Sequence, residues 1–279
     1  MSVPLKPPFT YFGGKLAIAD RIVALMPEHE HYVELYCGSL AVLLGKPPVL
    51  LETVNDIDGD LVNFWKQLRE RPADLIRVCA LTPHSRAELT ASRDLDGADD
   101  LERARRIWIR LTQGRGGHTQ KRTGWRYYQN PSGTHASMPD YLDAYVARIG
   151  PALDRLRGVS LECRPALEVI RDYGRHPGCL LYADPPYLGS VRGGSDMYAT
   201  EMLTPEQHRE LLEVLLGCRA AVVLSGYASP LYDGLLDGWS RREITTQTGN
   251  GGTDRARTEV VWSNRPFPQG HLFDLDESA

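Results

Sequence analysis

The sequence predicts an α/β fold, a mostly parallel sheet with helices on both of its faces. Short apolar runs alternate with helix-like segments along most of the 279 residues, and this alternation is typical of parallel strands joined by crossover helices. Several runs end in a glycine turn or an acid, residue types that bind ligands at the carboxyl edge of such a sheet. The segment 80–150 breaks the alternation and becomes rich in glycine and arginine, which indicates an insertion with its own contact surface.

Seven short apolar runs are predicted to be strands, because each has the length of a strand and is followed by a turn or a helix. In chain order they are 31–36, 49–54, 160–163, 179–183, 220–224, 241–246 and 258–262. The last two lie close together in the sequence, and we expect them to form a hairpin that closes the sheet.

Helices are predicted between most of these strands. They cover 16–26, 40–44, 61–79, 166–173 and a segment that begins at Thr204. Pro72 interrupts the third of them, because proline lacks the backbone N–H that a helix interior requires. The last begins with Thr204-Pro205-Glu206-Gln207, which combines a capping-box pattern with proline at the first helical position.

The composition is that of an ordinary globular protein, with 42% hydrophobic and 24% charged residues. No apolar stretch approaches the ~20 residues of a membrane span, and residues 1–6 lack the apolar core of a signal peptide. The five cysteines are odd in number, scattered and without CxxC spacing, which argues against a disulfide framework or a zinc site. We therefore expect a cytoplasmic protein that binds no membrane and no metal.

Positive charge is concentrated in one part of a chain whose net charge is −4. From Arg103 to Pro139 there is no aspartate or glutamate. The same stretch holds eight basic residues, Arg103, Arg105, Arg106, Arg110, Arg115, Lys121, Arg122 and Arg126. Such a segment on a mildly acidic protein predicts a contact with a polyanion, although a solvated helix face followed by a loop has the same composition.

A stiff corner follows the apolar run 179–183. Its sequence is Asp184-Pro185-Pro186-Tyr187, and proline restricts both itself and the preceding residue to extended conformations. A carboxylate, a carbonyl and an aromatic ring are thus held together at the carboxyl end of a strand. These groups suit an exocyclic amine on a flat ring such as adenine, because the acceptors aim the nitrogen lone pair outward and the ring stacks. Taken alone, the same residues also fit an ordinary proline-rich turn.

Two further segments point to an adenosine-containing ligand. The segment 34–39 places Gly38 at a strand-to-helix turn, where a ligand can approach the backbone. Asp56 ends the next strand, a position from which an acid commonly binds ribose hydroxyls. Asp56 could equally cap the following helix, with Asp58 taking the other role. Tyr11-Phe12-Gly13-Gly14-Lys15 has the composition of a lid over the same ligand, or of a plain turn.

These segments together resemble the Dam-like N6-adenine DNA methyltransferases. The similarity runs from about residue 7 to 266 and rests on the order of the motifs, each of which is modest by itself. They are Tyr11-Phe12-Gly13-Gly14-Lys15, Glu34-Leu35-Tyr36-Cys37-Gly38-Ser39, Asn55-Asp56-Ile57-Asp58, the basic insertion, Asp184-Pro185-Pro186-Tyr187, Leu224-Ser225-Gly226-Tyr227 and Glu259-Val260-Val261-Trp262-Ser263-Asn264.

The resemblance implies a Rossmann-like methyltransferase sheet that binds S-adenosylmethionine without a metal or an obligatory protein partner. The residues it assigns to this cofactor are Tyr11, Gly13, Gly14, Lys15, Glu34, Tyr36, Cys37, Gly38, Ser39, Asp56, Ile57 and Asp184. The catalytic corner that holds a flipped adenine is Asp184, Pro185, Pro186 and Tyr187. The catalytic domain would comprise 1–80 and 151–268, with a tail at 269–279. A mainly helical target-recognition domain at 81–150 would bind double-stranded DNA through Arg110, Arg115, Lys121, Arg122 and Arg126.

Two departures from the family pattern keep other functions open. Leu40 stands where a second glycine is usual, which could narrow the approach of the cofactor. The segment 163–166 lacks the acid before an aromatic residue that often contacts the cofactor's adenine. The alternatives are a methyltransferase that acts on an RNA amine or a protein amide through the same corner, and a DNA-binding module without catalysis.

Overall fold

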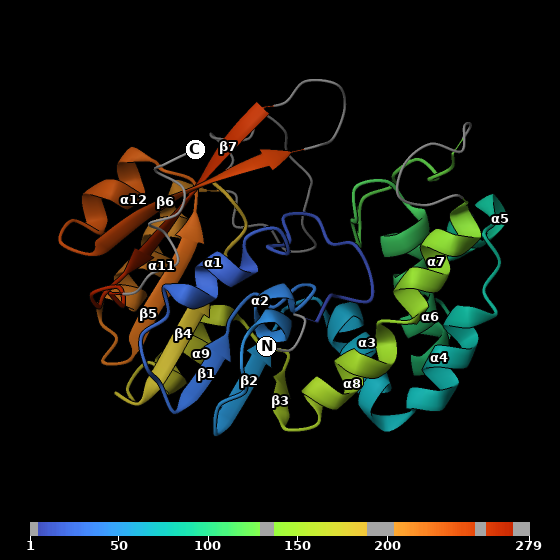
Figure 1. The fold of residues 1–279 in the computed structure, drawn as a ribbon, viewed down its shortest axis with the longest axis horizontal. Helices are drawn as coiled ribbons and strands as arrows, with labels where there is room; N and C mark the ends of the chain where they lie inside the picture. Colours follow the sequence, from blue (N-terminus) through green and yellow to red (C-terminus); the bar gives the residue numbers. More distant parts are fainter. Residues whose placement is uncertain (1–4, 129–136, 189–203, 249–254, 270–279) are drawn as a thin grey trace.

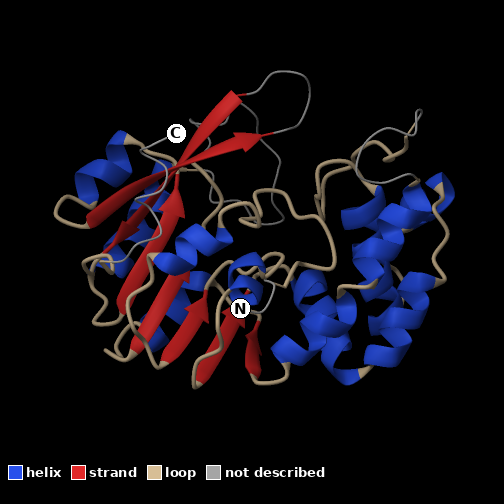
Figure 2. Ribbon diagram, viewed as in Figure 1, coloured by secondary structure: helices blue, strands red, loops and turns tan. Residues whose placement is uncertain are grey.

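The computed structural model describes residues 5–128, 137–188, 204–248 and 255–269. These residues form an α/β fold with one seven-stranded mixed sheet. Figure 1 shows the sheet and its covering helices on one side of the molecule and a group of helices on the other. Figure 2 shows that this second group contains no strand in the described part of the chain.

The strands lie in the order β3-β2-β1-β4-β5-β7-β6. Their bounds are β1 (His31–Glu34), β2 (Leu51–Asn55), β3 (Val159–Glu162), β4 (Cys179–Ala183), β5 (Ala221–Gly226), β6 (Ser240–Thr248) and β7 (Arg255–Ser263). The first five pair in parallel, and β7 is antiparallel to both of its neighbours. The chain order changes direction between β1 and β4, the place where open α/β sheets bind ligands.

All seven predicted strands occur in the structure, and β6 and β7 form the expected hairpin. One feature of this hairpin goes beyond the prediction. The second strand, β7, lies between β5 and β6, so the start of β7 reaches the edge of the sheet where the parallel strands end.

Apolar residues on both faces of the sheet are buried beneath helices. Neighbours in one strand alternate between two cores: Tyr32 belongs to one and Val33 to the other, as the period of two in a strand requires. The first core is covered by α1 (Ala19–Ala24) and α2 (Ala41–Gly45). The second is covered by α9 (Ala166–Tyr173), α11 (Pro205–Leu216) and α12 (Pro230–Leu235).

The helix boundaries follow the predicted signals. In the capping box of α11, Gln207 N donates to Thr204 Oγ1 at 3.3 Å and Thr204 N donates to Gln207 Oε1 at 3.2 Å. The predicted interruption at Pro72 separates two helices. The first ends at Glu70 and the second begins with Pro72 in its first turn. The helix predicted at 16–26 is shorter than expected, since α1 covers only Ala19–Ala24.

Six helices make up the second group. They are α3 (Gly59–Glu70), α4 (Pro72–Ala80), α5 (Arg86–Ala91), α6 (Asp100–Gln113), α7 (Met138–Val146) and α8 (Ile149–Leu156). The central helix α6 packs against α3, α4 and α5, and its Trp108 shares one buried cluster with Trp65 of α3. The predicted insertion 81–150 therefore packs together with helices that lie outside its bounds. Among the described residues, no helix has the length and apolar character needed to cross a membrane.

Candidate active site

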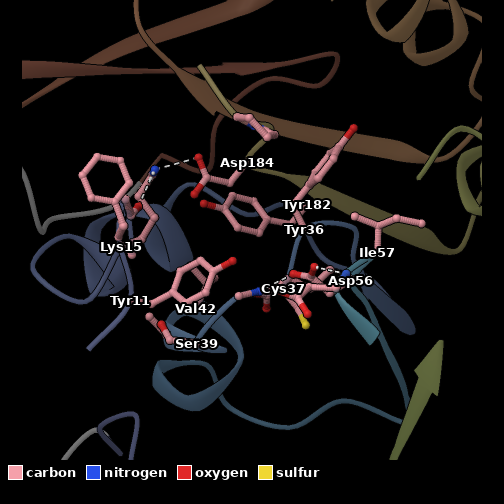
Figure 3. Close-up of a pocket in the computed structure, with 18 residues that line it drawn as sticks. Tyr11, Lys15, Tyr36, Cys37, Ser39, Val42, Asp56, Ile57, Tyr182 and Asp184 are labelled. Atoms are coloured by element: carbon pink, nitrogen blue, oxygen red, sulfur yellow. Dashed lines mark hydrogen bonds and ion pairs between the residues drawn. The ribbon is translucent and has the colours of Figure 1, made fainter. Parts of the chain in front are cut away.

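A pocket opens at the carboxyl edge of the sheet, beside the ends of β1 and β4, where the strand order changes direction (Figure 3). It collects segments that are far apart in the sequence, from the N-terminal loop to the end of β4. All twelve residues that the resemblance assigns to the cofactor lie in its lining: Tyr11, Gly13, Gly14, Lys15, Glu34, Tyr36, Cys37, Gly38, Ser39, Asp56, Ile57 and Asp184. The fold thus brings the three predicted cofactor motifs to one place.

The glycine turn after β1 is tightly packed against the N-terminal loop. Gly38 has φ +47°, and a Cβ there would lie 2.8 Å from Cε1 of Tyr11. A side chain at this position would collide with the tyrosine ring, so the turn requires glycine. Its backbone N–H donates to Asp56 Oδ2 at 2.9 Å, which ties the turn to the end of β2.

Asp56 and Asp58 divide the two roles that the sequence left open. Asp58 caps α3, because its carboxylate accepts from Asp60 N at 3.1 Å and Leu61 N at 3.3 Å. Asp56 lines the pocket and accepts from the Gly38 and Asp58 backbone. Burial raises the pKa of Asp56 to about 6, since removal from water disfavours the charged form.

Glu34 ends β1 as a buried acid. Its Oε2 accepts from the Tyr32 hydroxyl at 2.8 Å and from Leu43 N at 3.1 Å. Burial raises its pKa to about 8. The protonated acid therefore fixes the start of α2 against β1 and forms one wall of the pocket.

Leu40, the first departure from the family pattern, keeps the backbone conformation that a glycine adopts most easily. Its φ is +59°, the only positive φ among the described residues other than glycine. The side chain is fully buried in the core and is absent from the pocket lining. The expectation that Leu40 narrows the pocket is therefore wrong, because the side chain points into the core.

The second departure, at 163–166, lies beside the pocket. Cys163 lines a neighbouring hollow together with Ile57 and Asp58. The Arg164 guanidinium pairs at the surface with Asp172 at 2.9 Å. The segment is fastened to the sheet through Asn55, whose side chain exchanges hydrogen bonds with the Arg164 backbone.

Asp184 stands at the end of β4 and meets a buried lysine. Its Oδ1 lies 2.6 Å from Lys15 Nζ (Figure 3) and accepts from Ser225 Oγ at 3.1 Å. Lys15 is 6% exposed and also donates to the Tyr187 hydroxyl at 2.7 Å. Burial opposes the charge on Lys15, but the neighbouring Asp184, Tyr187 and Glu259 raise its pKa well above the usual value.

The sequence interpretation assigned no role to Glu259, although the structure places it in this cluster. Its Oε1 lies 3.3 Å from Lys15 Nζ, and both carboxylate oxygens lie 3.1 Å from the Tyr187 hydroxyl. Burial raises its pKa, while Lys15 opposes that rise. One sequence signal was present, because an acid directly before the apolar run Val260-Val261-Trp262 must be paired when it is buried.

The extended corner presents alternate residues to two neighbouring hollows. Asp184 and Pro186 line the main pocket, whereas Pro185 and Tyr187 line a smaller hollow next to it. Successive side chains of an extended chain point to opposite sides, so the corner forms a partition. The ring of Tyr227, which lies in the smaller hollow, stacks on Tyr187.

The basic stretch is only partly free to meet a polyanion. Three of its arginines pair with acids. Arg103 pairs with Asp60 of α3, Arg105 with Glu88 of α5, and both Arg105 and Arg106 with Glu102 of their own helix. The structure contradicts the prediction that Arg110 binds DNA. This side chain is 4% exposed and donates to the Ser92 carbonyl at 2.7 Å and the Thr119 carbonyl at 3.1 Å. Arg115, Lys121 and Arg122 are exposed, and Arg126 is half-buried beside the Tyr141 ring.

Comparison with known families bears directly on this site. Residues 11–112, which contain the lid, the glycine turn, Asp56 and α6, match the model of the D12 class of N6 adenine-specific DNA methyltransferases. The matched segment is less than half of the chain, so the match is a likeness to this class. Together with the relative described below, it supports an adenine-specific DNA methyltransferase that uses S-adenosylmethionine, in agreement with the resemblance found in the sequence.

Individual proteins match the chain over more of its length. The type II methyltransferase M1.LlaDCHI of Lactococcus lactis subsp. cremoris is 26% identical over 92% of this chain and 95% of its own. Among solved structures, a precorrin-8w decarboxylase from Methanobacterium thermoautotrophicum is 9% identical, with a TM-score of 0.39 and coverage of 94% and 98% of the two chains. A SAM-dependent methyltransferase from Agrobacterium tumefaciens is 12% identical, with a TM-score of 0.38 and coverage of 91% and 61%.

The methyl donor supplies its own activated methyl group on a sulfonium, so the residues of the site need only bind, orient and exclude water. Within the described ranges, no three His, Cys, Asp or Glu side chains gather closely enough to hold a metal ion. The buried Asp56 carboxylate at the pocket wall is the structural feature that suits such a donor.

Proposed function

We propose that this protein is a D12-class enzyme that binds S-adenosylmethionine in the pocket at the carboxyl ends of β1 and β4 and methylates N6 of an adenine rotated out of duplex DNA. The main structural support for this proposal is the partition formed by residues 184–187. It separates the main pocket, which Asp184 lines, from the smaller hollow, which Tyr187 lines, so a donor on one side and a base on the other would meet at this corner.

The donor is proposed to lie along the carboxyl ends of β1 and β2. Gly38 and Gly14 form part of the wall there, and the Tyr11 ring packs against the Gly38 turn. Asp56, at the end of β2, is positioned to accept hydrogen bonds from ribose hydroxyls. This assignment is supported by the gathering of all twelve predicted residues around one pocket.

The adenine is proposed to meet the other side of the corner. The carboxylate of Asp184 accepts an N6–H bond, which aims the nitrogen lone pair at the methyl group. Tyr187 offers a ring for stacking, worth about 1–3 kcal/mol per base. That contribution offsets much of the few kcal/mol needed to rotate the base out of the stack.

The helices of 81–150 are proposed to contact duplex DNA, with α3, α4 and α8 as their support. Arg115, Lys121 and Arg122 are exposed on this part of the chain, and they lack neighbouring acids in the sequence. Side chains of this kind bind phosphates and fix the register of a protein on DNA. The likeness to a type II methyltransferase supports a role beside a restriction enzyme.

Methyl transfer from labelled S-adenosylmethionine to duplex DNA tests the proposal. Asp184→Ala should abolish transfer and largely spare DNA binding, whereas Asp172→Ala, an exposed acid on α9, should change neither. The product should be N6-methyladenine, identified by mass spectrometry of the digested DNA. Full activity in Asp184→Ala would overturn the role of the carboxylate. Preferred methylation of structured RNA in a competition assay would overturn the DNA assignment.

A further inference from the structure

Three aromatic rings of the helical group, His84, Trp125 and Tyr127, form a ring stack that the proposed mechanism does not use. The Trp125 ring stacks on His84, with centroids 4.2 Å apart, and on Tyr127, with centroids 5.6 Å apart. The Arg86 guanidinium lies over the same rings, 4.8 Å from the Trp125 centroid and 6.0 Å from that of Tyr127. Arg86 begins α5, outside the basic stretch 103–139, and the sequence interpretation assigned it no role.

Backbone hydrogen bonds fix the ring stack in place. Gly114 and Trp125 form an antiparallel bridge, and beside it Arg126 N donates to the Gln113 carbonyl at 2.7 Å. The segment that carries the rings is thus paired with the end of α6. The His84 ring is held by the same segment, because its Nε2 lies 2.9 Å from the Arg126 carbonyl oxygen. The rings therefore give the guanidinium above them a fixed support.

Arg86 is exposed and, within the described ranges, pairs with no carboxylate. The next acid in the sequence, Glu88, pairs with Arg105 at 2.8 Å. The segment 129–136, which follows the ring stack in the chain, contains no aspartate or glutamate. A second exposed guanidinium, that of Arg115, lies 5.5 Å from the Tyr127 centroid. The ring stack thus carries two exposed guanidinium groups, a composition that suits a polyanion such as DNA.

The ring stack lies on the side of the molecule that carries the candidate active site. In Figure 1, α5 and the segment 114–128 lie at the upper end of the helical group, and the parallel strands of the sheet point to the same side. The candidate active site lies at the carboxyl edge of these strands. A duplex that delivers an adenine to the corner 184–187 can therefore extend over the ring stack.

We propose that Arg86 is a specificity-determining residue that recognises a guanine in the major groove, with the rings of Trp125 and Tyr127 holding its guanidinium. This inference rests on the proposed function, since it assumes duplex DNA as the substrate. Guanine presents N7 and O6 as acceptors in the major groove, and the N–H groups of arginine match both of them. Stacking on a ring occupies the face of a guanidinium and leaves the donors at its edge available.

The test begins with the recognition sequence of the wild-type enzyme, obtained by single-molecule sequencing of a methylated library of random duplexes. Each guanine in and beside that sequence is then replaced in turn by 7-deazaguanine, which lacks the N7 acceptor and still pairs with cytosine. Fluorescence anisotropy measures the affinity of the full chain for each duplex. At one position, the replacement should lower the affinity of the wild type about two- to tenfold. The same replacement should leave the affinity of Arg86→Ala unchanged.

Two further comparisons separate base recognition from other roles. The matched control is Arg77→Ala, an exposed arginine on α4, which should respond to every replacement as the wild type does. Tyr127→Leu should reduce the response at the position that depends on Arg86, and Tyr127→Phe should keep it, since the ring remains. If Arg86→Ala does not fold, Arg86→Met, which keeps the stem of the side chain, takes its place.

A position-specific loss of response in the Arg86 variant supports the inference. A uniform loss of affinity, with the response to every replacement kept, overturns it, because such a result marks a contact with phosphate. A recognition sequence without guanine in or beside it also overturns the inference. Failure of the wild-type chain to methylate any duplex would instead contradict the proposed function.

Discussion

The ring of Tyr227 covers one face of Tyr187, with ring centroids 4.3 Å apart and an interplanar angle of 12°. The hydroxyl of Tyr187 is held at the same time by Lys15 and Glu259. The ring is thus fixed at one face and at its polar end. In the proposed function, a flipped base would therefore stack on the other face of Tyr187 or displace Tyr227.

We expect Tyr227, which stacks on Tyr187, to contribute to the rate of methylation. Tyr227→Ala should lower kcat/KM for DNA by up to about tenfold, because an aromatic pair contributes ~0.5–1.5 kcal/mol beyond its buried area. Tyr227→Phe should keep most of the activity, since the ring remains. Steady-state methylation of duplex DNA measures both. Equal activity of the Ala and Phe variants would show that the stack does not position Tyr187.

Leu40 offers a prediction in which two effects oppose each other. Loss of a buried leucine side chain costs about 2–5 kcal/mol, whereas relief of its left-handed backbone recovers only about 1–2 kcal/mol. Both Leu40→Ala and Leu40→Gly should therefore be less stable than the wild type. Leu40→Gly should be the more stable of the two by about 1 kcal/mol, the reverse of the usual order within helices. Urea unfolding measures the free energy of unfolding of both variants. A Leu40→Ala protein more stable than Leu40→Gly would contradict the argument from backbone strain.

Glu34 should make the protein less stable as pH rises. Its pKa is about 8 in the folded protein and 4.5 in the unfolded chain, so the folded state binds the extra proton within this window. The free energy of unfolding should fall by up to ~1.4 kcal/mol per pH unit across it. Glu34→Gln lacks this slope. Its stability relative to the wild type should rise from pH 5 to 8, measured by urea unfolding. A constant difference would show that Glu34 is already ionised.

Local signals in the sequence were sufficient for most of the fold. The strand at Cys179–Ala183, the capping box at Thr204 and the helix break at Pro72 each depend on a few neighbouring residues. The gathering of the predicted cofactor residues around one pocket followed as well, because the ends of parallel strands meet at one edge of a sheet. The division of roles between Asp56 and Asp58 did not follow, since both acids have the same local setting.

The errors came from contacts between distant segments. Glu259 reaches Lys15 only because β7 lies between β5 and β6, an arrangement that a hairpin pattern does not specify. Arg110 is buried because the carbonyls of Ser92 and Thr119 converge on it. Leu40 avoids the pocket because its left-handed backbone directs the side chain into the core. Composition and spacing do not specify the partner in any of these contacts.

DNA binding should distinguish the exposed basic residues from the buried one. Lys121→Gln and Arg122→Gln should each reduce the slope of log affinity against log salt by about one, because each phosphate contact releases one counterion. The matched control is Arg157→Gln, which should leave the slope unchanged. Arg157 is exposed and lies just before β3, at the amino-terminal edge of the sheet. Arg110→Gln should lower the melting temperature instead, since it leaves two buried carbonyls without their donor. Fluorescence anisotropy across a salt series measures the slopes. An equal slope for Arg122→Gln and Arg157→Gln would remove Arg122 from the DNA interface.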